Sequence, residues 1–357
     1  MLTGEPGLII LFGSGETAAS SGKAHEHVAK SLNAPPNIAI LETPAGFEPN
    51  SPQVAGRVGD FLATRLQNYQ PTIHIIPARK KGTPYSPDNP AILAPIFQAN
   101  WLFLGPGSPT YAARQLKDSL ALHMIAARHR LGAALMLASS ATLAFSTYTL
   151  PVYEIYKVGM DLHWQEGVDF FGVFGLPLVV VPHWNNTDGG EELDTSRCYL
   201  GKARFSQLMA MLPAEQTVVG LDEHTTLVID KTHAQCQVMG NGRVVIHRQG
   251  KQAVYQSGDT FHPNELGQWR IPQPGEGIPT PIWEEALATH AKQLEKAAKP
   301  VTPPDEVLAL VAERTKARQQ KQWALSDALR SQIHAKGWLV KDTPSGPELE
   351  PLEKVIG

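Results

Sequence analysis

Cysteine is scarce in this sequence, and so are long apolar runs and any excess of charge of one sign. Only Cys198 and Cys236 occur among the 357 residues, which gives no support to a disulfide framework or a cysteine-based zinc site. No stretch approaches the ~20 apolar residues of a membrane span, and the run at residues 8–12 is too short for a secretory signal. A formal net charge of −3 provides no whole-chain attraction to nucleic acid or anionic membranes. We therefore expect a cytoplasmic protein that does not bind membranes and uses neither a cofactor nor a metal.

The composition is that of a soluble globular protein, in a chain too long for one small core. Hydrophobic residues make up 42% of the 357 residues and charged residues 18%, and this length suggests a main domain with an addition. Prolines and glycines crowd into residues 271–281, and more prolines follow at 300–304. We predict a main domain at 1–270, a proline-rich linker with one helix at 271–304, and a helical hairpin at 305–357.

Apolar runs typical of buried strands alternate with helical patterns through the main domain. Loops rich in glycine and proline follow several of these runs, which predicts an α/β fold with a doubly wound, mostly parallel sheet. Short strands between residues 237 and 255 predict a small antiparallel extension. Ligands bind such sheets beyond the carboxyl ends of the strands, so we expect the loops at Gly13, Gly105 and Ser140 to share one edge. The runs are residues 8–12, 38–41, 73–76, 101–104, 176–183 and 220–229.

The segment 131–145 combines a buried strand, a tight turn over small residues and the start of a helix. Serine hydrolases with doubly wound sheets place their nucleophile on such an elbow, because a sharp turn exposes the hydroxyl above the sheet. Ser140 is therefore the candidate nucleophile. The alternative is that Ser139 and Ser140 only cap the helix.

A histidine follows another buried strand, at residues 176–183. A single histidine at a strand end is more often a hydrogen-bonded structural residue than a catalytic one. His183, however, falls at the same predicted sheet edge as Ser140, and the polar loop at 184–197 follows it. This position favours a role for His183 in a site.

Residues 7 to about 260 resemble the peptidase family of dipeptidase E and cyanophycinase, serine relatives of the class I glutamine amidotransferases. The resemblance implies a class I glutamine amidotransferase-like fold and a serine hydrolase that cleaves an amide bond in a small peptide or related compound. It depends on the glycine-rich turn after the first strand and on the motifs Gly105-Pro-Gly-Ser108, Ala138-Ser-Ser-Ala-Thr142, Pro182-His183 and Gly220-Leu-Asp-Glu-His-Thr225.

The resemblance also implies roles for individual residues. The catalytic serine of the family falls on Ser140 and its histidine on His183, while its acid, about fifteen residues after the serine, points to Glu154. The donors to the oxyanion would be the N–H groups of Gly107 and Ala141.

The elbow departs from the family pattern, because Ala138 and Thr142 stand where relatives have glycine. The glycines of the family keep the strained elbow free of side-chain clashes, and Thr142 is expected to narrow the oxyanion site. The departure leaves open a catalytically silent ligand-binding module of the same fold. In either case, the residues expected to bind a substrate or ligand are Glu16, Ser108, Trp184, Asn185 and Arg197.

The C-terminal residues 306–350 resemble the C-terminal end of cysteinyl-tRNA synthetases. The match consists of Arg314-x-x-x-Arg318, Gln322-Trp-Ala-Leu-Ser-Asp-Ala-Leu-Arg330, Gly337 and Lys341-Asp-Thr-Pro-Ser-Gly346. The resemblance implies contact with tRNA, whereas a plain helical hairpin that docks on the main domain is the alternative. The nucleotide-binding motifs of the synthetase are absent, so we do not expect aminoacylation. The sequence leaves open whether two copies form a homodimer.

Overall fold

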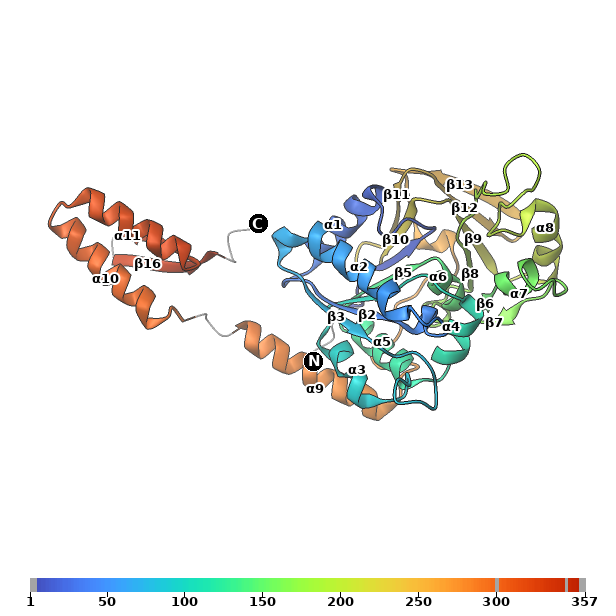
Figure 1. Ribbon diagram of the computed structural model, residues 1–357, viewed down its shortest axis with the longest axis horizontal. Coiled ribbons are helices and arrows are strands. Elements are labelled where there is room, and N and C mark those ends of the chain that lie inside the picture. The colour runs from blue at the N-terminus through green and yellow to red at the C-terminus, as the bar shows by residue number, and fades with distance from the viewer. Residues whose placement is uncertain (1–4, 299–301, 344–345, 353–357) are drawn as a thin grey trace. The chain divides into compact units, whose positions relative to one another are not determined.

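The computed structural model describes residues 5–298, 302–343 and 346–352 (Figure 1). The chain divides into two compact units, with the boundary between Ala291 and Lys292. Helix α9 (Thr280–Ala298) runs across this boundary. Its N-terminal half belongs to the first unit, where Ala286 is fully buried in the core.

A mixed eight-stranded sheet forms the centre of the first unit (Figure 1). The neighbouring strands β1, β5, β4, β2 and β3 are parallel, and β10, β11 and β14 extend the sheet in antiparallel fashion beyond β1. The α/β fold expected from the sequence, with its antiparallel extension, is confirmed. In sheet order the strands are β14 (Thr260–Phe261), β11 (Gln235–Gly240), β10 (Thr225–Asp230), β1 (Ile9–Phe12), β5 (Ala134–Ala138), β4 (Trp101–Leu104), β2 (Asn37–Leu41) and β3 (Thr72–Ile76).

Helices cover both faces of this sheet, which is why its central strands β1, β5 and β4 are apolar and buried throughout. In β1, Ile9 and Leu11 belong to one hydrophobic cluster, while Ile10 and Phe12 belong to another, because successive side chains of a strand point to opposite faces. Helices α1 and α2 pack into the second of these clusters, and α3, α4 and α5 into the first. These helices are α1 (Gly22–Ser31), α2 (Ser51–Arg65), α3 (Pro90–Gln98), α4 (Pro109–Leu116) and α5 (Leu120–Arg130).

A second sheet of four strands, in the order β13-β12-β9-β8, completes the first unit. Strands β8 and β9 pack against α8, since Phe205 and Leu208 belong to the same hydrophobic cluster as Val181 and Val218. The elements are β8 (Leu178–Val181), β9 (Thr217–Leu221), β12 (Arg243–Arg248), β13 (Lys251–Gln256) and α8 (Gly201–Met211), with the short α6 (Ser140–Ala144), α7 (Val152–Tyr156), β6 (Tyr148–Thr149) and β7 (Gln165–Glu166) beside them.

The second unit contains the predicted helical hairpin and a β-hairpin that the sequence did not predict. Helices α10 (Asp305–Gln319) and α11 (Trp323–Ala335) are followed by the antiparallel strands β15 (Trp338–Thr343) and β16 (Gly346–Pro351). The core of this unit consists of Val307, Ile333, Trp338 and Val340. The nearly buried Arg314 donates two hydrogen bonds of 2.8 Å to the carboxylate of Asp342, so the motif residues of this segment tie α10 to the β-hairpin.

Within residues 5–298, 302–343 and 346–352, no helix has the length and apolar character needed to cross a membrane. The same residues contain no group of three or more His, Cys, Asp or Glu side chains placed to hold a metal ion. Cys198 and Cys236 are free and buried.

Candidate active site

Ser139 occupies the turn between β5 and α6, with φ of 50° and ψ of −114°. A positive φ is unfavourable for a residue with a side chain, and serine hydrolases hold their nucleophile in a strained turn of this kind. The N–H of Ser139 donates to the carbonyl of Phe12 at the end of β1, at 3.3 Å. The Thr142 hydroxyl donates to the carbonyl of Ser139 at 2.7 Å. These bonds hold the turn from both sides.

A chain of hydrogen bonds joins Ser139, His183 and Glu223. Ser139 Oγ lies 3.0 Å from His183 Nε2, and His183 Nδ1 lies 2.8 Å from Glu223 Oε1. Because an ionised carboxylate only accepts, Nδ1 carries the proton of the neutral imidazole and Nε2 is free to accept the serine hydroxyl proton. General-base activation of a serine needs this orientation of the imidazole.

Backbone and side-chain bonds position the histidine and the acid. His183 follows β8 with φ of 51°, and its N–H donates to the carbonyl of Gly13 at 3.1 Å. Glu223 lies in the turn between β9 and β10, where its N–H donates to Asn185 Oδ1 at 2.7 Å. Asn186 Nδ2 also donates to Glu223 Oε1, at 2.9 Å. The hydrogen bond from His183 lowers the pKa of Glu223, which keeps this carboxylate ionised at neutral pH.

The sequence predicted that Ser140 lies beside His183. The structure places Ser139 there instead. The side chain of Ser140 is only 3% exposed, and its hydroxyl donates to the carbonyl of Gly105 at 3.1 Å. The serine that the turn brings to His183 comes one residue earlier in the chain, at Ser139, which is the residue with positive φ. Ser140 instead ties the elbow to the loop after β4. It follows that Ala141, not Thr142, lies two residues after the serine at the turn.

Glu154 is not the partner of His183 either, because both ring nitrogens of His183 are occupied by Ser139 and Glu223. Glu154 lies on α7 and accepts a hydrogen bond from the Thr110 hydroxyl at 2.5 Å. Its other carboxylate oxygen is buried and has no hydrogen-bond partner among the described residues. Glu154 therefore does not occupy the position beside His183 that the sequence predicted.

The loop containing Gly107 approaches the backbone of Pro44 so closely that only glycine fits. A Cβ atom at position 107 would lie 1.9 Å from the Pro44 carbonyl oxygen, which also accepts the N–H of Ser108 at 2.9 Å. Ser108 caps α4, since its Oγ accepts the N–H of Tyr111. The loop conformation is thus fixed by the segment around Pro44.

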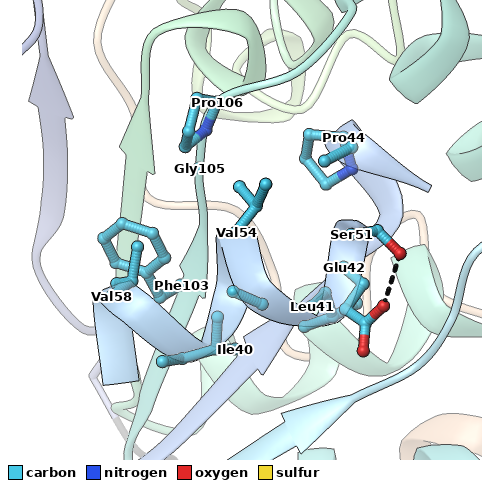
Figure 2. Close-up of a pocket in the computed structure, with 12 residues that line it drawn as sticks. Ile40, Leu41, Glu42, Pro44, Ser51, Val54, Val58, Phe103, Gly105 and Pro106 are labelled. Atoms are coloured by element: carbon cyan, nitrogen blue, oxygen red, sulfur yellow. Dashed lines mark hydrogen bonds between the residues drawn. The ribbon is translucent and has the colours of Figure 1, made fainter. Parts of the chain in front are cut away.

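A narrow pocket separates this loop from α2, and a buried carboxylate lies at its end (Figure 2). Gly105 and Pro106 line one side, and Pro44 lies across from them. Glu42 accepts the Ser51 hydroxyl at 2.8 Å and the Nε–H of Arg79 at 2.7 Å. Glu42 therefore anchors the segment on which the Gly107 loop rests.

Of the residues expected to bind substrate, Glu16 lies close to the hydrogen-bonded chain. Burial raises its pKa, and a bond to its own backbone N–H and the nearby side chains of His183 and His224 partly offset this effect. The side chain of Asn185 accepts the N–H of Glu223 and so fixes the turn that contains Glu223. Trp184 and Arg197 instead line a groove beside α8 whose lining does not include Ser139.

Glu223 is the hydrogen-bond partner of His183 that the sequence analysis missed. Its segment, Gly220–Thr225, was recognised as a motif, and the acidic turn between two strand patterns is the signal that could have identified it. The carbonyl of Leu221, at the end of β9, accepts the N–H of Trp184, directly after His183.

Comparison with solved structures identifies the fold of the first unit as that of a peptidase. A peptidase from an acI-B1 Actinobacterium superposes with a TM-score of 0.59 and 19% sequence identity, covering 73% of this chain and 98% of the other. The resemblance in fold expected from the sequence is confirmed. No model of a known protein family matches the sequence.

Comparison with curated proteins finds a second likeness, over a short segment. Cysteine–tRNA ligase of Chlamydia pneumoniae is 53% identical over 49 residues, which is 14% of this chain and 10% of the ligase. The ligase of Methanosarcina mazei is 45% identical over 51 residues, or 14% of this chain and 11% of the ligase. The chain thus spans about a tenth of the length of these relatives, consistent with a C-terminal segment fused to a peptidase-like unit.

Proposed function

We propose that the chain is a serine hydrolase that cleaves an amide bond in a small peptide, with Ser139 as nucleophile, His183 as general base and Glu223 as the orienting acid. The observation that carries the proposal is the unbroken hydrogen-bonded chain from the strained turn at Ser139 to Glu223. The peptidase fold supports it independently.

In the proposed reaction, Ser139 Oγ attacks the carbonyl carbon of the amide and its proton passes to His183 Nε2. Glu223 stabilises the imidazolium that forms, through the bond to Nδ1. His183 then gives the proton to the departing amine, which leaves Ser139 as an ester. Water, activated by the same histidine, hydrolyses the ester and restores the free hydroxyl.

The oxyanion of the tetrahedral intermediate needs donors that are fixed before the reaction. With Ser139 as nucleophile, the N–H that follows it is that of Ser140, in place of the Ala141 N–H expected from the sequence. The N–H of Gly107 is the second proposed donor. The bond from the Ser140 hydroxyl to the Gly105 carbonyl supports this pair, because it fixes the two backbone segments relative to each other.

The substrate contacts are proposed to come from Glu16 and Ser108. A carboxylate beside two histidines suits the amino group of a short peptide, since its charge is opposite to that of an ammonium group. Glu16→Gln is expected to raise the KM for peptides with a free amino group more than for the same peptides when acetylated.

Labelling with a fluorophosphonate probe tests the nucleophile without knowledge of the substrate. Wild type and Ser140→Ala should be labelled, and Ser139→Ala should not. Hydrolysis of a panel of dipeptides should follow the same order. Labelling of Ser139→Ala at the wild-type rate would reject Ser139 as nucleophile, and an unlabelled, inactive wild type would favour the silent binding module.

We also propose that the second unit contacts RNA through the turn between α10 and α11. Trp323 begins α11 with 56% of its surface exposed, and the guanidinium carbon of Arg318 lies 5.8 Å from the centre of its ring. The turn also carries the exposed Lys321. An exposed aromatic ring among basic side chains suits stacking on an unpaired base.

A tRNA transcript provides the test of this second proposal. Affinity should fall as salt rises, and Trp323→Ala should weaken binding while Leu325→Ala, at an equally exposed apolar position of α11, should not. Equal binding by both variants would contradict a stacking role for Trp323.

A further inference from the structure

A groove runs along α8 on the side facing the hairpin of β12 and β13. It consists of two adjoining cavities, of about 310 and 210 Å³, which share Met209 and His247. The larger cavity alone reaches the lower end of the size range of small-ligand sites, about 300 Å³. We call it the α8 groove. Its lining includes Trp184, Arg197, Phe205, Arg243, Val245 and Val254.

Basic side chains dominate this lining although the whole chain has a net charge of −3. Six of its lining residues are basic and none is acidic, but burial and the charge of Arg197 lower the pKa of His247. At neutral pH this leaves five positive side chains: Arg197, Lys202, Arg243, Arg248 and Lys251. Asp222 lies behind the lining and pairs with Arg243 at 3.4 Å, and Asp194 lies near Arg197. These two acids do not balance five positive groups, so the groove attracts anions.

Arg197 is held in place before any ligand arrives. Its guanidinium carbon lies 4.0 Å from the centre of the Trp184 ring, and Nη1 donates to the Trp184 carbonyl at 2.8 Å. The Trp184 ring is itself fixed, because it lies so close over Gly220 that a Cβ there would be 2.3 Å from a ring atom. No other hydrogen bond of the guanidinium to the described residues is seen, so it retains donors for a planar, bidentate contact with an oxyanion.

The floor of the α8 groove is apolar, with Val245 and Phe205 beneath the basic groups and Val254 at the edge. This combination suits a ligand with an anionic group and an apolar body. Nucleic acid is disfavoured, because single strands bind through exposed aromatic faces and both aromatic residues of the lining, Trp184 and Phe205, are buried.

From these observations we infer that the α8 groove binds a small organic anion, a phosphate or carboxylate attached to an apolar body, with Arg197 and Arg243 as its main contacts. The site is separate from the hydrogen-bonded chain of Ser139, none of whose members lines the groove. The backbone nevertheless connects the two, since the N–H of Cys198, next to Arg197, donates to the carbonyl of His183 at 3.1 Å.

Calorimetric titration of the full chain tests the inference with three probes: phenyl phosphate, phenylacetate and inorganic phosphate. The two aromatic anions should distinguish a phosphate from a carboxylate preference, and phenyl phosphate should bind more tightly than inorganic phosphate. Charged hydrogen bonds are worth enough that Arg197→Ala should weaken the preferred probe by roughly 10- to 100-fold.

Two further groove variants and one control show whether a loss of probe binding in Arg197→Ala results from misfolding. Arg243→Ala, on the exposed rim, should also weaken binding, and Val254→Glu should weaken it by adding a negative charge to the edge of the groove. Arg57→Ala removes an exposed arginine of α2, outside the groove, and should bind as wild type does. Absence of binding by any probe at millimolar concentration and low salt overturns the inference. Equal affinity of wild type and all three groove variants overturns it as well.

Discussion

Replacing Glu223 by glutamine should separate the charge of the acid from its orienting role. Asn186 Nδ2 already donates to Glu223 Oε1, and the carbonyl oxygen of a glutamine can accept from the same group and from His183 Nδ1. Glu223→Gln is therefore expected to keep the imidazole in its productive tautomer. What it removes is the negative charge beside the imidazolium.

The size of this effect follows from the geometry. Two unit charges about 4 Å apart attract by roughly 4 kcal/mol at an effective dielectric constant of about 20. The side chains of His183 and Glu223 are 17% and 27% exposed, so water screens part of this attraction and about 3 kcal/mol remains. The expected loss in kcat for Glu223→Gln is about 10²-fold, with little change in KM.

Asn186 provides the second arm of the experiment. In Asn186→Ala alone, the carboxylate remains an acceptor whichever way it turns, so the loss should be small. In the double variant, the glutamine amide can turn its NH₂ group toward His183 and impose the wrong tautomer, with a loss of about 10⁴-fold. The two changes should thus be strongly non-additive.

Hydrolysis rates and fluorophosphonate labelling rates both report this series. Glu154→Gln serves as the matched control, because its carboxylate contacts Thr110 and not His183. A double variant no worse than Glu223→Gln would refute the argument about the tautomer. A loss in Glu154→Gln equal to that in Glu223→Gln would refute the assignment of the acid.

Three further outcomes are expected. Thr142→Gly should not raise the rate of hydrolysis, and a clear gain in rate would contradict this expectation. In urea unfolding it should destabilise the first unit by about 1–2 kcal/mol, because it removes the hydrogen bond to the Ser139 carbonyl and places glycine in a helix. Deletion of residues 298–357 should leave the unfolding midpoint of the first unit unchanged, and a fall of more than about 5 °C would show that the removed part belongs to its core. Asp342→Ala should lower the free energy of unfolding of the second unit by about 2–3 kcal/mol, as measured by hydrogen exchange, which is less than for a fully buried pair because Asp342 is 45% exposed. The additional change Arg314→Met should restore part of this stability, and no recovery would indicate that the ion pair is not the cause.

The sequence predicted the layout of the first unit because hydrophobic periodicity determines which segments are buried strands. It also predicted that a serine and His183 meet at the carboxyl edge of the sheet, since both follow strands. Which of two adjacent serines meets His183 could not be read from residue types. That choice depends on the backbone, where Ser139 has positive φ and Ser140 begins the helix.

The carboxylate that pairs with His183 could not be predicted from distance along the sequence. Glu223 comes from a turn 40 residues after His183, whereas Glu154 is much nearer to the elbow in the chain. The pairing of β8 with β9 brings the two together, and this pairing is a long-range contact that a single sequence does not reveal. The β-hairpin of the second unit was missed because proline and glycine near residue 345 predicted an end to regular structure.

Helix α9 links two parts that are each packed around their own interior. The hydrophobic clusters of the first unit draw their members from residues up to Leu287, and the cluster of the second unit draws its members from residues between Val307 and Leu349. A substitution that loosens one interior can be compensated only by neighbours within the same interior. Each interior can therefore accumulate substitutions on its own, at a rate set by the tolerance of its own packing.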